Sequence, residues 1–227
     1  MFTLHIANKN YSSWSLRPWV LMKALDIPFL EEVHPLQEGT SWSTYRDFSP
    51  SGTVPALHTE GQVVWDSMAI AEFLAERYPA VWPADPAARA WARCAAAEMH
   101  SSMSALRNQC GMSVGIRVKL RDYSAALEKD VKRVDELWSQ GLERFGGPFL
   151  AGQAFTAVDA FFAPVAYRVR TYDLPLSPIA KDYAERLVAH PAMLEWEGAA
   201  LAETWRESSH EQDFRDAGEI TADFRAS

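Results

Sequence analysis

The stretch "FTLHIANKNYSSWSLRPWVLMKAL", residues 2–25, joins a strand pattern to a helix pattern through a run of hydroxyl side chains. Its first six residues have the pattern of a short buried strand. Leu16, Trp19, Val20 and Ala24 then recur at helical spacing and form one apolar face. One tyrosine and three serines precede this face, which is more than a helix cap needs. We therefore expect one of these hydroxyls to face a ligand.

The overall composition excludes several classes of protein. The chain has 227 residues, enough for one large domain or two small ones. Its net charge is −8, and it has no basic cluster, so nucleic-acid binding is not expected. No apolar run reaches the roughly 18 residues of a membrane span, and no signal peptide is visible. Cys94 and Cys110 lack metal or CxxC spacing, which predicts free thiols in a reducing cytoplasm and no metal.

The secondary-structure pattern of the sequence changes near Pro83. Before it, strand and helix patterns alternate in the order βαβαββα. After it, strand patterns vanish and helical patterns cover 85–110, 121–146, 156–172, 178–189 and 191–204. The sequence thus predicts an α/β domain at 1–81, a linker at about 82–86 and an all-helical domain at 87–227.

Two details refine the second domain. The run at 156–172 is almost wholly apolar, which predicts a buried central helix. Thr156 and Asp159 have the spacing of a capping box at its start, with Asp in place of Glu. The polar tail from Arg206 onward is expected to be loose.

Four motifs, in this order and at these distances, resemble the glutathione transferase family. They are "SSWSLR" (12–17), "TVPAL" (53–57), "WDSMAIAEFLAERYP" (65–79) and "FTAVDAFFAPV" (155–165). The first is similar to the serine signature Ser-x-x-x-x-Arg of the zeta and tau classes. The resemblance covers nearly the whole chain. It implies a thioredoxin-like N-terminal domain that binds glutathione as cosubstrate, a C-terminal helical bundle that receives a small electrophile, and a homodimer.

The resemblance also implies how the thiol is activated. A thiolate is the nucleophile, and a hydroxyl that donates a hydrogen bond to sulfur favours that form. Ser12, at the head of the first helix, is the expected donor. Ser13 is the neighbouring candidate. Tyr11 is the third, because tyrosine has this role in other classes, and it is also expected at the acceptor site.

Further residues are expected to bind glutathione. The Val54-Pro55 bond is expected to be cis, so that Val54 presents its backbone to the peptide ligand. Asp66 is expected to bind the γ-glutamyl ammonium, and Ser67 the carboxylate. Gly52 and Thr53 are small where the family often has Lys or Gln, so another group must contribute. The expected contributor is Gln37 or Trp42, in the loop region. Trp14, in the serine motif, is also expected to bind glutathione.

The acceptor side is predicted from one helix face. Met99, Met103, Leu106 and Cys110 recur along it, and the family resemblance places that face opposite the sulfur. The same stripe also suits a core, above all at Met99 and Leu106. We expect Met103, Arg107 and Cys110 at the acceptor site, with Arg107 contacting an anionic acceptor or else forming a surface salt bridge.

Three functions follow. The first is conjugation of glutathione to electrophiles, or peroxide reduction with it. The second is a zeta-type maleylacetoacetate isomerase, although Trp14 replaces the cysteine and Trp19 the second arginine of the zeta signature. The third is a non-catalytic glutathione-binding or scaffold module. A cysteine-type thiol transferase is disfavoured because no cysteine precedes Cys94.

Overall fold

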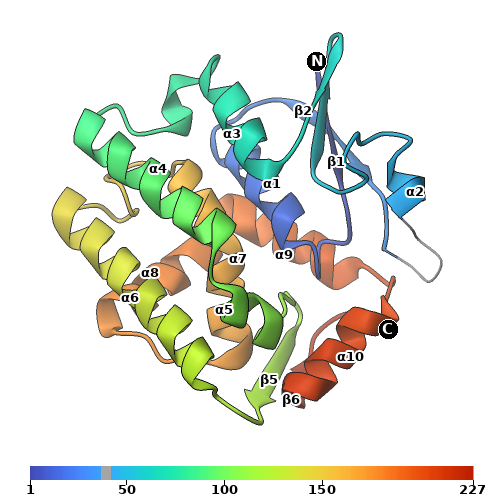
Figure 1. Ribbon diagram of the computed structural model, residues 1–227, viewed down its shortest axis with the longest axis vertical. Coiled ribbons are helices and arrows are strands. Elements are labelled where there is room, and N and C mark those ends of the chain that lie inside the picture. Colours follow the sequence, from blue (N-terminus) through green and yellow to red (C-terminus); the bar gives the residue numbers. More distant parts are fainter. Residues whose placement is uncertain (37–41, 227) are drawn as a thin grey trace.

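The computed structural model describes residues 1–36 and 42–226 (Figure 1). Its N-terminal part has the predicted βαβαββα order. The elements are β1 (Phe2–Ile6), α1 (Ser13–Ala24), β2 (Phe29–Val33), α2 (Trp42–Tyr45), β3 (Ala56–Thr59), β4 (Gln62–Val64) and α3 (Ser67–Ala75). The sheet order is β2-β1-β3-β4. Strand β1 pairs in parallel with β2 and antiparallel with β3, so the thioredoxin-like prediction is confirmed.

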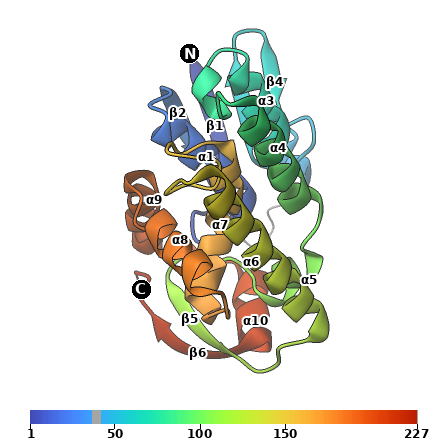
Figure 2. The same ribbon diagram turned by 90° about the vertical axis from the view of Figure 1, so that its left-hand side faces the viewer.

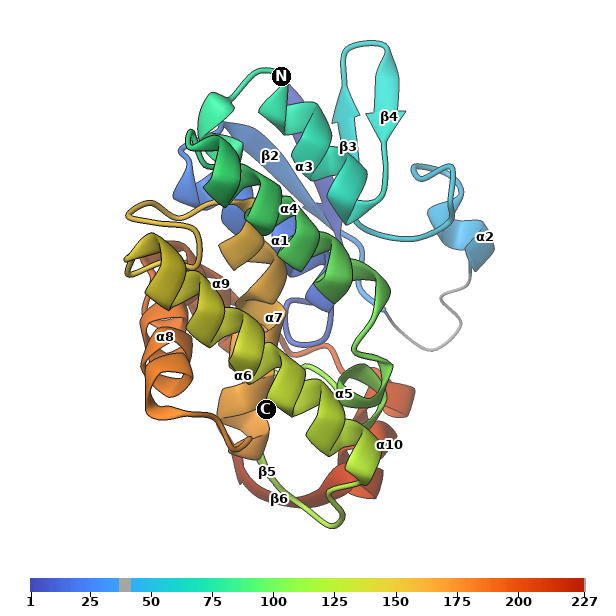
Figure 3. The same ribbon diagram turned by 60° about the vertical axis from the view of Figure 1, so that its left-hand side comes forward.

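The rest of the chain is mainly helical, as predicted. It contains a short 3₁₀ helix η1 (Pro79–Val81), then α4 (Pro86–Ser101), α5 (Ser104–Gln109), α6 (Ala125–Phe145), α7 (Ala157–Tyr172), α8 (Pro178–Val188), α9 (Pro191–Ala202) and α10 (Ser208–Ala217). Helix α7 is buried along its length except at Arg170, which confirms the predicted central helix. It packs against α1, α4 and α8 and lies behind α4 and α6 in Figure 3. The domain boundary near residues 82–86 stays a prediction.

The single helix predicted over 85–110 is wrong, because the structure breaks it. Helix α4 ends at Ser101, and Met103 adopts a left-handed conformation with φ of 60°. The hydroxyls of Ser101 and Ser102 donate back to carbonyls of the last turn of α4, at 2.9 and 2.5 Å. Such bonds compete with helix continuation. The carboxylate of Asp130, from α6, accepts from the Leu106 N–H at 3.0 Å and satisfies a donor in the new first turn.

The prediction of a wholly helical second domain with a loose tail is also wrong. Strands β5 (Ile116–Leu120) and β6 (Gly218–Asp223) form an antiparallel pair, with α10 beside it (Figure 2). Within β5, apolar side chains alternate with Arg117 and Lys119, a period-two signal that the sequence does contain. The tail is held by Arg225, whose guanidinium forms ion pairs with Glu211 and Asp223. No helix in the described parts of the chain is long and apolar enough to cross a membrane.

The predicted capping box at the start of α7 is present. Asp159 is fully buried and accepts hydrogen bonds from the Thr156 N–H at 2.9 Å and from the Leu150 N–H at 3.0 Å. Its other partners are the Tyr183 hydroxyl of α8, at 2.9 Å, and the Thr156 hydroxyl, at 3.3 Å. Burial raises the pKa of Asp159 to about 6. One carboxylate therefore joins the loop before α7, the helix itself and α8.

Replacing Asp159 should destabilise the fold strongly. Asp159→Ala leaves four buried donors without this acceptor, so we expect the free energy of unfolding to fall by about 3 kcal/mol or more. Urea denaturation measures this change. Asp182→Ala, at an exposed position of α8, is the matched control and should stay within about 0.5 kcal/mol of the parent. Equal stability of the two variants would contradict the proposed role of Asp159.

Candidate active site

A cavity of about 560 Å³ lies between the N-terminal domain and the helical part. It brings together six of the residues predicted from the sequence: Tyr11, Ser12, Ser13, Trp14, Val54 and Arg107. Its remaining walls are formed by Leu36, Tyr45, Gly52, Thr53, Gly111, Met112, Arg168, His210 and Asp213. Pro55, Asp66, Ser67, Met103 and Cys110 are not among the lining residues, and Gln37 lies outside the described residues.

Ser12 acts as the N-cap of α1. Its Oγ accepts from the Ser15 N–H at 3.4 Å and donates to the Ser15 Oγ at 2.7 Å. The Ser15 Oγ in turn accepts from the Ala7 N–H at 3.2 Å, at the end of β1. The only proton of the Ser12 hydroxyl is thus used within the protein, which is the cap role that serines often have at this position.

Ser13 is the first residue of α1 and is among the residues that line the cavity. Its backbone N–H donates to the Tyr11 carbonyl at 2.9 Å. Its Oγ has no hydrogen-bond partner among residues 1–36 and 42–226. A free hydroxyl at a helix N-terminus combines a donor with the positive end of the helix dipole. This position suits a ligand atom that carries negative charge.

The Tyr11 hydroxyl is bound to another residue of the protein and is not free for a ligand. The phenol donates to Glu211 Oε1 at 2.6 Å, and its ring stacks on His210 of α10 with centroids 5.0 Å apart. Burial, reinforced by Glu211, raises the pKa of Tyr11. The ring therefore forms part of the cavity wall, while the hydroxyl binds the C-terminal segment.

Trp14 lies between two guanidinium groups. Its ring centroid is 4.2 Å from the Arg17 guanidinium carbon and 4.7 Å from that of Arg107, both within cation–π range. Arg107 also donates to the carbonyls of Met99 and His100 at the end of α4. The indole therefore links the start of α1 to the helical part of the chain.

Arg168 adds a third positive charge to this region. It is buried in α7, and its Nε donates to the Cys110 carbonyl at 2.7 Å. Burial, with a contribution from Arg107, lowers the pKa of Arg168 to about 10. The pKa of Arg17 is also lowered, by burial and then by the other two arginines, with Asp66 opposing. Arginine nevertheless stays protonated near neutral pH.

These three arginines lack direct carboxylate partners. Unlike Arg133 and Arg225, none of Arg17, Arg107 and Arg168 forms an ion pair within the part of the chain that the structure describes. The lining residues of the cavity include one carboxylate, Asp213, against the two guanidiniums of Arg107 and Arg168. Buried cations without counterions favour the entry of an anion.

The predicted backbone site for a peptide ligand has the expected form. The Val54-Pro55 bond is cis, which confirms that prediction. Val54 lines the cavity, and neither its N–H nor its C=O has a hydrogen-bond partner within the described residues. Both groups are therefore available to an extended ligand.

Asp66 and Ser67 stand at the start of α3. Asp66 is the N-cap: its Oδ1 accepts from the Met68 N–H at 2.9 Å, and its Oδ2 lies 3.2 Å from His100 Nε2. Ser67 is fully buried, and its Oγ has no partner in the described structure. A buried hydroxyl without a partner is unusual, and Ser67 is not among the residues that line the cavity.

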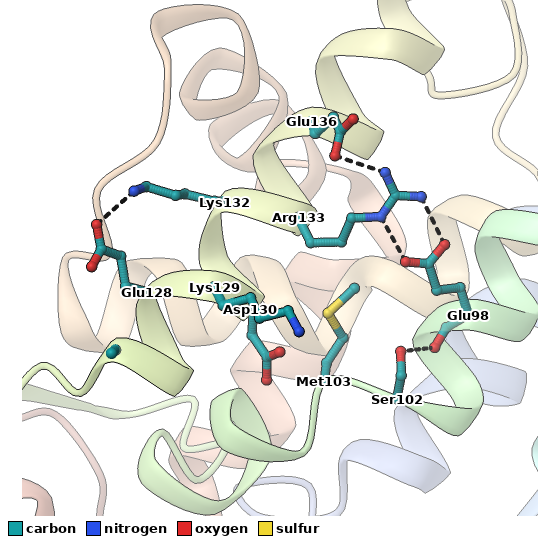
Figure 4. A pocket seen from close by; sticks show the side chains of 10 residues that line it. Glu98, Ser102, Met103, Glu128, Lys129, Asp130, Lys132, Arg133 and Glu136 are labelled. Carbon is teal, nitrogen blue, oxygen red and sulfur yellow. Dashed lines mark hydrogen bonds and ion pairs between the residues drawn. The ribbon is translucent and has the colours of Figure 1, made fainter.

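Met103 and Cys110 lie outside the lining of this cavity. Met103 lines a separate surface hollow of about 630 Å³ between the end of α4 and the start of α6 (Figure 4). The charged groups there largely pair with one another, as Arg133 does with Glu98 and Glu136. Cys110 is buried, and burial raises the pKa of its thiol to about 12. The acceptor-site roles of Met103 and Cys110 stay predictions.

The residues of the cavity wall that were not predicted include Arg168, His210 and Asp213. Arg168 interrupts the apolar run of α7, and a charge at a buried helical position is a signal that sequence reasoning had available. His210 and Asp213 belong to the tail that was expected to be loose, so no local pattern identified them.

Comparison with known proteins decides the family. The model of the glutathione S-transferase N-terminal domain matches residues 11–77, and that of the C-terminal domain matches residues 115–199. The chain belongs to the glutathione S-transferase family. The predicted classification as an enzyme of the glutathione transferase type is thereby confirmed at the level of the family.

Individual relatives of this glutathione S-transferase family member include isomerases. A maleylacetoacetate isomerase from Pseudomonas aeruginosa is 28% identical over 201 residues, which cover 83% of this chain and 92% of that protein. A probable maleylacetoacetate isomerase from Caenorhabditis elegans is 28% identical over 170 residues, covering 73% and 78%. A glutathione transferase homologue from Burkholderia, solved with bound glutathione, shares the fold with a TM-score of 0.67, 22% identity and coverage of 88% and 97%.

The different partners of the two serines predict different effects on stability. Ser12→Ala removes the cap of α1 and the bond to Ser15, so we expect the free energy of unfolding to fall by about 1 kcal/mol. Ser13→Ala removes no internal hydrogen bond and should change it by less than about 0.5 kcal/mol. Denaturant unfolding of both variants tests this, and a larger loss for Ser13→Ala would show that the assigned partners are wrong.

Proposed function

We propose that this chain is a glutathione transferase in which the Ser13 hydroxyl donates a hydrogen bond to the sulfur of bound glutathione. The observation that carries the proposal is the free Ser13 Oγ at the head of α1, inside a cavity that also contains the unpaired backbone groups of Val54. Ser12 then holds the helix start in place. The Burkholderia homologue solved with glutathione supports this choice of ligand.

The energies of these interactions are sufficient for activation. A free thiol has a pKa near 8.5, and lowering it by about two units requires about 2.7 kcal/mol. A hydrogen bond to a charged sulfur supplies about 1.5–3 kcal/mol. The N-terminus of α1 adds about 0.3–1 kcal/mol. The thiol proton passes to solvent, and the thiolate forms a bond to the electrophilic atom of the acceptor. The acceptor then releases its leaving group or, in an addition, takes up a proton from water, and the serine acts as neither nucleophile nor base.

The remaining parts of glutathione would be held by backbone and helix-start groups. Val54 pairs with the peptide as an added strand. Ser67 and the N-terminus of α3 hold the γ-glutamyl carboxylate, and Asp66 holds its ammonium. Ser67 is the first residue of α3, so its backbone N–H belongs to the first turn of that helix. Trp14 and Gln37 remain proposed contributors, and the homodimer and the cytoplasmic location remain predictions.

Steady-state kinetics of Ser13→Ala test the proposed donor. Losing a hydrogen bond to the thiolate should lower kcat/KM at neutral pH by about tenfold to a hundredfold. The apparent pKa in the pH dependence of kcat/KM should rise by about one to two units, because the thiolate loses its stabilisation. The defect should therefore shrink at high pH, and the variant should still be retained on immobilised glutathione.

The controls separate the alternatives. Tyr11→Phe keeps both serines and should preserve the pH profile. An unshifted profile in Ser13→Ala, together with a shifted one in Ser12→Ala, would move the donor to Ser12. Retention of the parent protein on glutathione without turnover of any acceptor would favour the non-catalytic binding module.

A zeta-type isomerase is the second candidate, and one observation favours it. Trp19 stands where the zeta signature has its second arginine, a cation that would suit a dicarboxylate substrate. Trp19 is buried and packs against Trp196, so position 19 does not face the cavity. Arg107 and Arg168 supply positive charge to the cavity from the helical domain instead. The similarity to maleylacetoacetate isomerases agrees with a substrate that carries carboxylates.

Arg107→Gln tests whether the acceptor is anionic. We expect KM for a maleyl compound to rise about tenfold or more, because a charge-assisted hydrogen bond is lost, while KM for a neutral chromogenic electrophile stays nearly constant. Arg144→Gln, at an exposed position of α6, is the control with the same charge change. Equal effects of Arg107→Gln on both acceptors would contradict a specific anion contact.

A further inference from the structure

A second group of chemically active side chains lies on the N-terminal sheet, outside the cavity. In β1, His5 alternates with Leu4 and Ile6, whose side chains belong to the core that includes α1. His5 therefore points to the opposite face. There its ring lies 4.0 Å from that of His58 and 5.1 Å from that of His34. This face holds a cluster of imidazoles that the proposed transferase chemistry does not use.

The parallel pairing of β1 and β2 brings a carboxylate to the same place. His5 is the direct partner of Glu32 in the strand register. His34 follows Glu32 by two residues, and its N–H continues the ladder by donating to the Ile6 carbonyl at 2.7 Å. Side chains two residues apart in an extended chain share one face. The backbone therefore positions His5, Glu32 and His34 together on rigid elements.

The distances between the three ligand atoms match a metal centre. His5 Nδ1 lies 2.9 Å from His34 Nε2 and 3.5 Å from Glu32 Oε2. His34 Nε2 lies 4.0 Å from the same carboxylate oxygen. Tetrahedral zinc, with bonds of about 2.0–2.1 Å, separates its ligand atoms by roughly 3.3 Å. The three separations surround this value, and a bound metal would replace the hydrogen bond between His5 and His34.

The cluster is also accessible from one side. The Glu32 side chain is 56% exposed, so the cluster is open to ions from solvent.

We propose that His5 Nδ1, His34 Nε2 and the Glu32 carboxylate bind a Zn²⁺ ion, with water in the fourth position. Among the described residues, this is the one group of three such ligands whose atoms lie within 4.8 Å of one another. Two imidazoles and one carboxylate select zinc over the hard cations Mg²⁺ and Ca²⁺, which prefer all-oxygen sites.

Zinc binding would also affect the wall of the candidate active-site cavity. The Tyr45 hydroxyl donates to the His34 carbonyl at 2.8 Å, and Leu36 follows two residues later. Tyr45 and Leu36 both line the cavity. A metal bound at His34 therefore fixes the backbone segment that carries this wall. The ion itself is structural, since the cluster is not part of the cavity lining.

Zinc titration of the chelator-treated chain tests the proposal. It is carried out without glutathione, so that its outcome is independent of the proposed function, and in a Cys94→Ser background, because that exposed thiol is a competing ligand. Competition with a chromogenic zinc chelator should show one ion bound per chain. Co²⁺ in place of zinc should give the visible bands of a tetrahedral site.

Three variants make the test specific. Glu32→Gln and His34→Gln should each weaken zinc binding by at least about tenfold and remove the cobalt bands. Glu31→Gln is the matched control, since it changes the same charge at the neighbouring position, where the side chain bonds Lys9 instead. Zinc should raise the melting temperature of the parent and of Glu31→Gln only. Absence of stoichiometric binding, or equal binding by Glu32→Gln and Glu31→Gln, would overturn the proposal.

Discussion

The packing of α1 against α7 is the contact on which the rest of the structure depends. Helix α1 belongs to the N-terminal domain, yet most of its residues are buried and α7 is among its main neighbours. Because α7 is itself buried along nearly its whole length, the two helices form a common core between the domains. Ser13 at the head of α1 and Arg168 in α7 consequently reach one cavity.

This shared core explains why cations accumulate beside the serine loop. Arg17 and Arg168 both lie on buried helices, and neither has a carboxylate partner among the described residues. Aromatic rings and backbone carbonyls compensate them instead, as Trp14 does for Arg17 and the Cys110 carbonyl for Arg168. Such contacts hold a guanidinium in place but leave its charge available to a ligand.

The sequence predicted those parts of the fold that depend on local periodicity. The βαβαββα order, the buried helix α7 and its capping box each follow from neighbouring residues, and the cis Val54-Pro55 bond followed from a short family motif. The break at Met103 was not predicted, because it depends partly on Asp130, which lies in another helix. Strand β6 was missed for a similar reason, since its partner β5 is about a hundred residues away.

For the candidate site, the sequence identified the serines at positions 12–15. It did not show which serine caps α1 and which is free to bind a ligand. The sequence alone does not distinguish the roles of Ser12, Ser13 and Ser15. Ser12 becomes the cap and Ser13 remains free because the loop has one particular backbone path, in which Ser15 bonds Ala7 of the preceding segment. The grouping of His5 with Glu32 and His34 likewise required the strand register, because no short spacing links these residues.

The backbone path of the serine loop is in turn set by the far end of the chain. The buried Glu203 accepts from the Lys9 N–H at 2.7 Å and from the Asn10 N–H at 3.2 Å. Glu211 binds the Tyr11 hydroxyl and Arg225 together. Among the described residues, the Lys9 and Asn10 N–H groups and the Tyr11 hydroxyl have no other acceptor, so the loop keeps this conformation only while the C-terminal segment is docked. The C-terminal segment has a polar sequence and was expected to be loose. It nevertheless helps to position the hydroxyls that the proposed chemistry needs.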